Sequence, residues 1–295
     1  MANESRYRVF LKVAETGSIS RAAEALQYTQ SGVSHIVRSL EEDFGVKLLI
    51  RHRSGVELTD KGERILPYLR RVVQEEDNLK SFTYHMNNLV AGCLRIGSFS
   101  SVTEFWMPDL VMHFRKAYPD VELVILDGNY DEIRQWIRQG IVDLGFLSAI
   151  AANELQFTPL YDDPLCVIMP AGHPLEQKKN VTLEEIVSYP LIMETPGCDN
   201  DIKILLERSG LHPSPAFCFR DDFEIAAFVE RGIGISISQE LVQKAMHAHV
   251  SMRPLDPPCS RMIGIGSLKT QNSILTSLFI DYMKEYLKKN ARSAC

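Results

Sequence analysis

Apolar and polar positions follow a helical period in the N-terminal part of the chain. Residues 7–16 predict a first amphipathic helix whose apolar side faces inward. Ser18 is a suitable N-cap for a second, short helix, and Thr29 for a third that ends at Gly45, the left-handed residue expected there. The third helix buries a face formed by Val33, Ile36, Val37 and Leu40. The pattern predicts two helices joined by a tight turn at Gln27-Tyr28 and supported by the first helix.

The following segment changes to a strand pattern and then returns to a helical one. Residues 46–62 alternate apolar and polar positions around a turn near Ser54-Gly55, which predicts a two-stranded wing. A helix of about 45 Å is expected from Thr59 to Leu89, with Pro67 as the position of a kink. Its apolar stripe has no partner helix nearby in sequence, so we expect it to pack against a second copy of the chain. The alternative is a helix that lies on its own domain.

The remainder of the chain alternates between strand and helix patterns. Expected strands include residues 94–99 and 142–148, with a single helix over 100–117 and a turn over 158–164. Such alternation predicts parallel sheets with right-handed crossovers. About 200 residues is long for one sheet of this kind, so we expect two similar lobes joined by strands near Tyr161–Asp163 and Ile265–Leu268.

Charge distribution and composition narrow the class of protein. The net charge is −6, but residues 1–65 carry ten Lys and Arg against nine Asp and Glu, so the head is near neutral and the body is acidic. This distribution suits local DNA contact by the head. The N-terminus lacks the apolar region of a signal peptide and no apolar run is long enough for a membrane span, so we expect a cytoplasmic protein. Six scattered cysteines without metal-ligand spacing are expected to be reduced thiols.

The outward face of the third helix carries the candidate DNA contacts. Short polar donors and acceptors near the front of a helix suit base edges in the major groove, and the candidates there are Gln30, Ser31, Ser34 and His35. Contacts to the DNA backbone or from the wing are expected from Ser18, Arg21, Arg38, Arg51, His52 and Arg53. Glu41, Glu42 and Asp43 are expected to form a solvated face. The alternative for the whole face is a solvated polar surface.

Motifs in this head resemble the winged helix-turn-helix of LysR-type transcriptional regulators. They run unbroken as F-x-x-V-A-E-x-G-S at 10–18, A-A-x-x-L at 22–26, T-Q-S-x-V-S at 29–34, L-E-x-x-F-G-V-x-L-L at 40–49 and L-T-x-x-G at 58–62. Many relatives have Pro-Ala where this chain has Ser31-Gly32, and arginine where it has His35. A neutral His makes one contact to guanine where Arg makes two, so the base preference at that position is expected to differ.

The resemblance implies the overall organisation. It comprises an N-terminal winged helix-turn-helix (helical, with a small β-wing), a long linker helix and a two-lobed α/β effector domain of the periplasmic-binding-protein type. The expected boundaries are 1–58 for the DNA-binding domain, 59–90 for the linker and dimerisation helix, and 91–295 for the effector-binding domain. Lobe I is expected at about 91–161 and 268–295, and lobe II at about 162–267.

The family also implies partners and an effector site. A homotetramer on promoter DNA is expected, with a dimer through the linker helix, a small effector between the lobes and contact with RNA polymerase. Backbone N–H groups at helix starts favour an anion, so an organic anion is the expected effector, and strand ends of α/β sheets favour ligands. Candidate effector contacts are Ser98, Ser100, Ser101, Gly128, Asn129, Thr195, Pro196, Gly197 and Asp222.

Three other functions remain as alternatives to this reading of the sequence. A two-lobed solute-binding protein would leave residues 1–90 without a purpose. A thiol redox-sensing regulator would use Cys198, at a helix start that lowers a thiol pKa, with Cys218. An enzyme is disfavoured because no phosphate-binding loop, nucleophile elbow or metal motif is present in the sequence. We therefore expect no catalytic residues, no bound metal and no cofactor.

Overall fold

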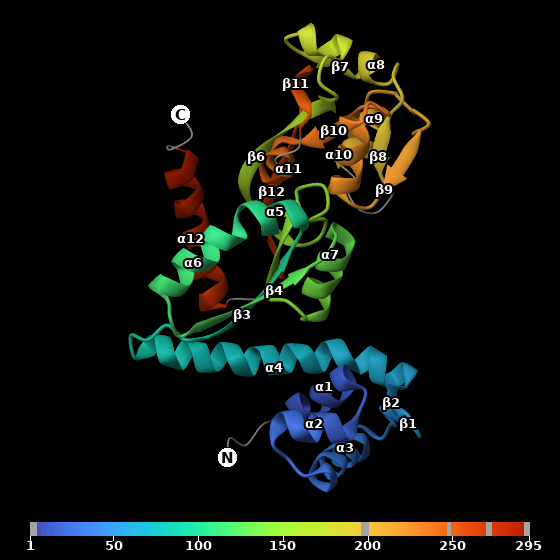
Figure 1. Ribbon diagram of the computed structural model, residues 1–295. Coiled ribbons are helices and arrows are strands. Elements are labelled where there is room, and N and C mark those ends of the chain that lie inside the picture. The colour runs from blue at the N-terminus through green and yellow to red at the C-terminus, as the bar shows by residue number, and fades with distance from the viewer. Residues whose placement is uncertain (1–4, 196–200, 247–248, 270–272, 292–295) are drawn as a thin grey trace. The chain divides into compact units, whose positions relative to one another are not determined.

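A computed structural model describes residues 5–195, 201–246, 249–269 and 273–291 (Figure 1). The chain divides into two compact units. Unit 1 comprises residues 1–92 with 138–141, and unit 2 comprises residues 93–137 and 142–295.

Unit 1 is a winged helix-turn-helix followed by a long helix. Its elements are α1 (Arg6–Thr16), α2 (Ile19–Leu26), α3 (Gln30–Phe44), β1 (Leu49–His52), β2 (Gly55–Leu58) and α4 (Asp60–Met86). The caps are those expected: Ser18 accepts from the Arg21 N–H at 3.4 Å and Thr29 from the Gly32 N–H at 3.1 Å. Gly45 ends α3 with φ 65°. The antiparallel β1–β2 pair forms the wing.

Glu41 of α3 was expected to be solvated, and this expectation is wrong. It is buried, and its carboxylate accepts the N–H groups of Leu48 at 2.9 Å and Leu49 at 3.3 Å and an ion pair from Lys47 at 2.7 Å. Burial raises the pKa of Glu41, but these hydrogen bonds outweigh it and hold the pKa below its ordinary value. Glu41 therefore joins the end of α3 to the wing, whereas Glu42 and Asp43 are exposed as expected.

Helix α4 has two opposite faces of different exposure. One face packs on α1 and buries Leu66, Leu69 and Val73. The opposite face leaves a row of large apolar side chains exposed, namely Tyr68, Val72, Leu79, Phe82 and Met86. Helix α4 is continuous in Figure 1, and Pro67 lies inside it.

Unit 2 is an α/β fold with two lobes. Lobe I contains β3 (Gly92–Ser98), β4 (Val121–Asp127) and β5 (Leu144–Ser148), with α5 (Ser100–Phe105), α6 (Met107–Ala117), α7 (Tyr130–Gln139) and α12 (Ile274–Ala291). Lobe II contains β7 (Val181–Thr182), β8 (Ile192–Glu194), β9 (Phe217–Phe219), β10 (Ser236–Gln239) and β11 (Ser251–Asp256). Its helices are the 3₁₀ helix η1 (Pro174–Gln177), α8 (Leu183–Ile186), α9 (Asp201–Arg208), α10 (Asp222–Glu230) and α11 (Glu240–Met246).

Two long strands connect the lobes. These are β6 (Gln156–Met169) and β12 (Ser260–Ser267), which pair antiparallel with each other. The second half of β6 pairs with β10 and β11 of lobe II, and β12 also pairs with β5 of lobe I. The strand order is β4-β3-β5-β12-β6-β11-β7, with β10 joined to β6 and β8-β9 apart as a parallel pair.

Three details differ from the sequence expectations. Residues 100–117 form two helices because the chain restarts at Met107 with Pro108 in the first turn, where a missing N–H costs nothing. Residues 158–164 are not a turn but part of β6, since Asp163 is paired across the sheet with Arg261. The sheets are mixed and not parallel throughout, because β6 and β12 run antiparallel to their neighbours.

Candidate functional site

The outward face of α3 and the wing form one polar surface in unit 1. Gln30, Ser31 and His35 are exposed, and Ser34 is half-buried. The Arg51 guanidinium donates to the Ser34 hydroxyl at 3.1 Å, which joins the wing to the helix. The Ser31 hydroxyl lies 3.2 Å from the hydroxyl of the helix cap Thr29, so it is engaged within the helix start. The predicted base contacts therefore lie together on one accessible face.

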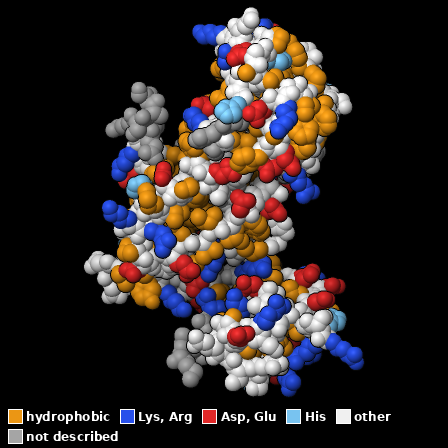
Figure 2. Space-filling model, in the orientation of Figure 1, with side chains coloured by type: hydrophobic (Ala, Val, Ile, Leu, Met, Phe, Trp, Pro, Cys, Tyr) orange, Lys and Arg blue, Asp and Glu red, His pale blue; other side chains and the backbone are white. Residues whose placement is uncertain are grey.

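Basic side chains surround this face. Arg21, Arg38, Arg51, His52 and Arg53 are all exposed, and Lys and Arg gather on the visible side of unit 1 in Figure 2. The His52 ring lies 3.5 Å from the Glu57 carboxylate. Ser18 is half-buried because its hydroxyl caps α2. The arrangement provides cations for phosphates around polar groups suited to base edges.

A second site is a cleft of about 450 Å³ between the lobes of unit 2. Lobe I contributes the start of α5 and the segment between β4 and α7. Lobe II contributes the end of β8, the start of α10 and α11, and Arg261 of β12 also reaches the cleft. The space is large enough for a small organic molecule.

Arg261 organises one wall of this cleft. Its side chain is only 4% exposed, and its Nε donates to the Asp163 carboxylate at 2.9 Å. Its other nitrogens donate to the Tyr130 hydroxyl at 3.1 Å and to the Ser101 hydroxyl at 2.8 Å. The guanidinium carbon lies 5.2 Å from the centre of the Phe99 ring. One buried cation therefore links the connecting strands β6 and β12 to lobe I and holds Ser101 at the edge of the cleft.

The predicted effector contacts separate into three groups. Those that line the cleft are Ser100, Ser101, Gly128, Asn129 and Asp222. Ser98 and Thr195 are not part of the cleft lining. Ser98 is fully buried and accepts a hydrogen bond from the Thr103 hydroxyl at 2.9 Å. The Thr195 N–H donates to the Phe219 carbonyl at 2.7 Å. Pro196 and Gly197 lie outside the described residues.

The candidate residues do not cap the two helices that border the cleft. None of the three serines caps α5: its N-cap residue is Phe99, which makes no side-chain cap bond. Asp221, and not Asp222, caps α10 by accepting the Phe223 N–H at 2.7 Å. Arg261 was not among the predicted site residues, although an arginine within an otherwise apolar strand was the available signal.

Carboxylates outnumber guanidinium groups in the described lining of the cleft. Two arginines, Arg220 and Arg261, lie there with six acids, namely Glu104, Asp127, Glu132, Glu194, Asp221 and Asp222. Partial burial, followed by the negative charges of Asp221 and Asp127, raises the pKa of Glu104 above its ordinary value. Figure 2 shows Asp and Glu side chains grouped on the visible face between the two lobes. The described lining of the cleft therefore carries more negative than positive formal charge.

The state of three cysteines is defined within the part of the chain that the structure describes. Cys166, Cys218 and Cys259 have free thiols, and Cys198 lies outside the described residues. Burial, with the nearby negative charges of Glu240 and Asp163, raises the pKa of Cys166 to about 12. Within residues 5–195, 201–246, 249–269 and 273–291, no group of His, Cys, Asp and Glu is placed to hold a metal ion. None of the described helices is long and apolar enough to cross a membrane.

Two family models together match most of the chain. Residues 5–63 match the model of the "Bacterial regulatory helix-turn-helix protein, lysR family". Residues 87–288 match the "LysR substrate binding domain".

Individual proteins are similar over the same length. An uncharacterized HTH-type transcriptional regulator of Bacillus subtilis, YvbU, is 32% identical over 95% of this chain and 97% of its own. HinK of Pseudomonas aeruginosa, a LysR family transcriptional regulator, superposes with a TM-score of 0.60 at 28% identity, covering 96% of this chain and 97% of its own. Full-length OxyR C199D of P. aeruginosa shares the fold, with a TM-score of 0.77 at 22% identity over 95% of this chain and 96% of its own.

Proposed function

The chain belongs to the LysR family of bacterial transcriptional regulators, and we propose that it reads promoter DNA with the α3–wing surface and responds to an effector in the inter-lobe cleft. The observation that supports this most directly is the continuous surface formed by α3 and the wing, joined by the Arg51–Ser34 hydrogen bond. Regulation, and not catalysis, is the activity proposed.

The roles within the DNA surface follow from reach and chemistry. Gln30 and His35 are exposed at the front of α3 and are proposed to contact base edges, with Ser31 and Ser34 beside them. The remaining group is proposed to contact the DNA backbone or the minor groove, namely Ser18, Arg21, Arg38, Arg51, His52 and Arg53. Phosphate contacts of this kind fix register without carrying sequence information.

The effector is proposed to carry a positively charged nitrogen. The sequence suggested an organic anion, because serines near a helix start suit one. In the folded chain that helix, α5, is short, and Arg261 is already paired with Asp163 at 2.9 Å. The excess of carboxylates in the lining favours a cation or a zwitterion, whose ammonium group would lie near Glu104, Asp127 and Asp221.

Assembly is proposed to use the exposed face of α4. Five large apolar side chains on one helix face are more than a solvated helix normally exposes, and a second α4 would cover them. A dimer through α4 and a further pairing into a homotetramer fit a site with two-fold symmetry. Contact with RNA polymerase is a further proposal.

DNA reading is tested by fluorescence anisotropy on the intergenic DNA upstream of the protein's own gene. Gln30→Ala is expected to weaken binding to the specific site by about 5- to 150-fold, corresponding to about 1–3 kcal/mol for a bidentate base contact. Binding to unrelated DNA should not change. Gln135→Ala, at an exposed position of α7, is the matched control. Equal specific affinity for Gln30→Ala and wild type would refute the proposed role of α3.

The charge of the effector is tested by a thermal-shift screen. Size-matched amines, basic amino acids and organic acids are compared on the full-length protein, first with wild type and then with Glu104→Gln. Amines are expected to raise the melting temperature, and the variant to lose part of the shift. A panel in which only organic acids stabilise the protein would overturn the proposal of a cationic effector while leaving DNA binding untouched.

A further inference from the structure

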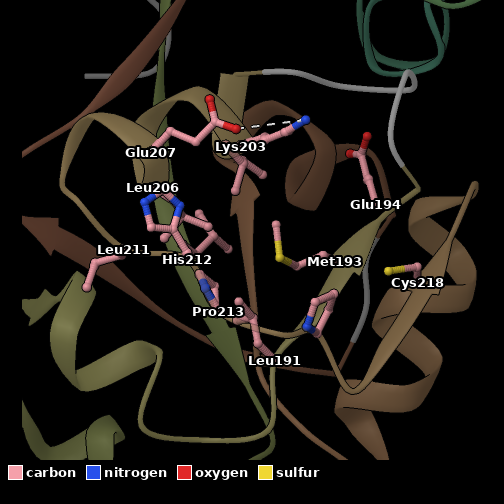
Figure 3. Close-up of a pocket in the computed structure, with 13 residues that line it drawn as sticks. Leu191, Met193, Glu194, Lys203, Leu206, Glu207, Leu211, His212, Pro213 and Cys218 are labelled. Atoms are coloured by element: carbon pink, nitrogen blue, oxygen red, sulfur yellow. Dashed lines mark ion pairs between the residues drawn. The ribbon is translucent and has the colours of Figure 1, made fainter.

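Lobe II contains a second cavity, of about 250 Å³, distinct from the cleft between the lobes. Helix α9 forms one side, β8 and β9 form the other, and the segment after α9 closes one end (Figure 3). Its floor consists of the core side chains Leu191, Ile202, Leu206 and Ile237. The cavity therefore opens into the hydrophobic core of lobe II and is not a shallow surface dent.

The walls of this cavity are fixed by local structure. The Leu211 N–H donates to the Leu206 carbonyl at 2.9 Å, and the Ala216 N–H donates to the Leu191 carbonyl at 2.8 Å. Between these two anchors, Pro213 and Pro215 restrict the chain. The space is thus formed before any ligand enters, which reduces the ordering cost of binding.

The chemistry of the lining favours an uncharged aromatic molecule. The Met193 side chain projects into the middle of the space in Figure 3, and thioether sulfur makes favourable contacts with aromatic rings. The Lys203 ammonium lies 3.8 Å from the Glu207 carboxylate, so these two rim charges compensate each other. A charged ligand would lose hydration in this apolar space, which is costly without a partner.

The volume indicates the size of the occupant. An engineered apolar cavity of about 150 Å³ in another protein binds benzene. A space of about 250 Å³ suits a molecule of two fused rings. Protein interiors rarely leave open volume of this size unfilled.

We propose that this cavity is a ligand site in lobe II for an uncharged aromatic molecule of two fused rings. It does not depend on the nature of the effector in the cleft. Glu194 borders both spaces, so an occupant would lie against the strand that also lines the cleft.

The test measures protection of Cys218, an exposed thiol on the cavity wall. The full-length protein is alkylated with N-ethylmaleimide with and without saturating indole, and each cysteine peptide is quantified by mass spectrometry. Indole is expected to slow alkylation of Cys218 at least fivefold. Cys259, half-buried elsewhere in lobe II, is expected to react at an unchanged rate.

Calorimetry with filled variants localises the binding. Met193→Trp fills the middle of the cavity and Cys218→Tyr blocks its exposed wall, and each is expected to weaken indole binding at least tenfold. Met252→Trp, on β11 away from the lining, is the matched control and should bind normally. Cys218→Tyr changes an exposed residue, so the test stands even where Met193→Trp fails to fold. Unprotected Cys218, or unchanged affinity in a folded filled variant, would overturn the proposal.

Discussion

The exposed face of α4 allows assembly to be tested with one substitution, Leu79→Lys. Leu79 is 64% exposed and has Phe82 and Met86 beside it, which are 50% and 70% exposed. Positions 68, 72, 79, 82 and 86 recur at the helical period, and 68 and 86 are five turns apart, so they share one face. Lys places a charge in the centre of the surface that a second copy would cover.

The size of the effect follows from the exposed fraction. Full burial of a leucine side chain contributes about 1.5–3 kcal/mol, and Leu79 has 64% of its surface left to bury. The loss is therefore about 1–2 kcal/mol per copy. Because a two-fold symmetric contact contains Leu79 from both copies, the total loss of binding free energy is about 2–4 kcal/mol. At 1.4 kcal/mol per factor of ten, the dissociation constant of the α4 contact should rise by about 30- to 700-fold.

Sedimentation velocity over a concentration series measures this change on the full-length protein. The molar mass of the main species is expected to halve for Leu79→Lys at concentrations where wild type stays assembled. Tyr84→Lys is the matched control, because Tyr84 is 43% exposed but lies about 140° around the helix from Leu79. Wild-type mass for Leu79→Lys, or an equal loss in Tyr84→Lys, would refute assembly through this face.

Three further outcomes are expected. Arg51→Ala should reduce the slope of log affinity against log salt for DNA by about 1, as anisotropy over a salt series would show; an unchanged slope would mean that Arg51 touches no phosphate. Affinity for a cationic effector should rise as pH rises through the pKa of Glu104, which lies above its ordinary 4.5, because only the ionised carboxylate attracts the cation; calorimetry should find this dependence reduced in Glu104→Gln. Arg261→Ala leaves Asp163 buried without its cation and should lower the free energy of unfolding by about 3–5 kcal/mol in urea, with a smaller loss when Asp163→Ala is added.

The sequence predicted the head of the protein well because its signals are local. Hydroxyl caps at Ser18, Thr29 and Thr59 and a left-handed glycine at Gly45 each act within four residues of their partners. The burial of Glu41 was missed because its partners lie six to eight residues away, across the bend between helix and wing. Capping motifs can therefore be predicted from the local sequence, whereas contacts across a bend between two elements cannot.

In the two-lobed domain, the expectations were wrong where residues far apart in the sequence form hydrogen bonds or ion pairs with each other. Residues 158–164 resemble a turn because they contain prolines and adjacent carboxylates. The residue that places Asp163 inside a sheet is Arg261, 98 positions later in the chain. Of the expected effector contacts, Ser100 and Ser101 line the cleft but Ser98 does not. Ser98 is buried at the end of β3 and accepts a hydrogen bond from Thr103, whereas Ser100 and Ser101 lie in the first turn of α5.

Carboxylates from both lobes line the cleft, and repulsion between them opposes closure of the lobes. Glu104 and Asp127 belong to lobe I, and Glu194 and Asp221 to lobe II. Each looks like an ordinary surface acid or cap in the sequence, and only the fold brings them to one space. The raised pKa of Glu104 records the proximity of Asp221 across the cleft, after burial. Closing the lobes would bring these like charges nearer and is opposed until a cation lies between them. A positively charged effector would therefore favour closure by differential binding, as a ligand must to shift a conformational equilibrium.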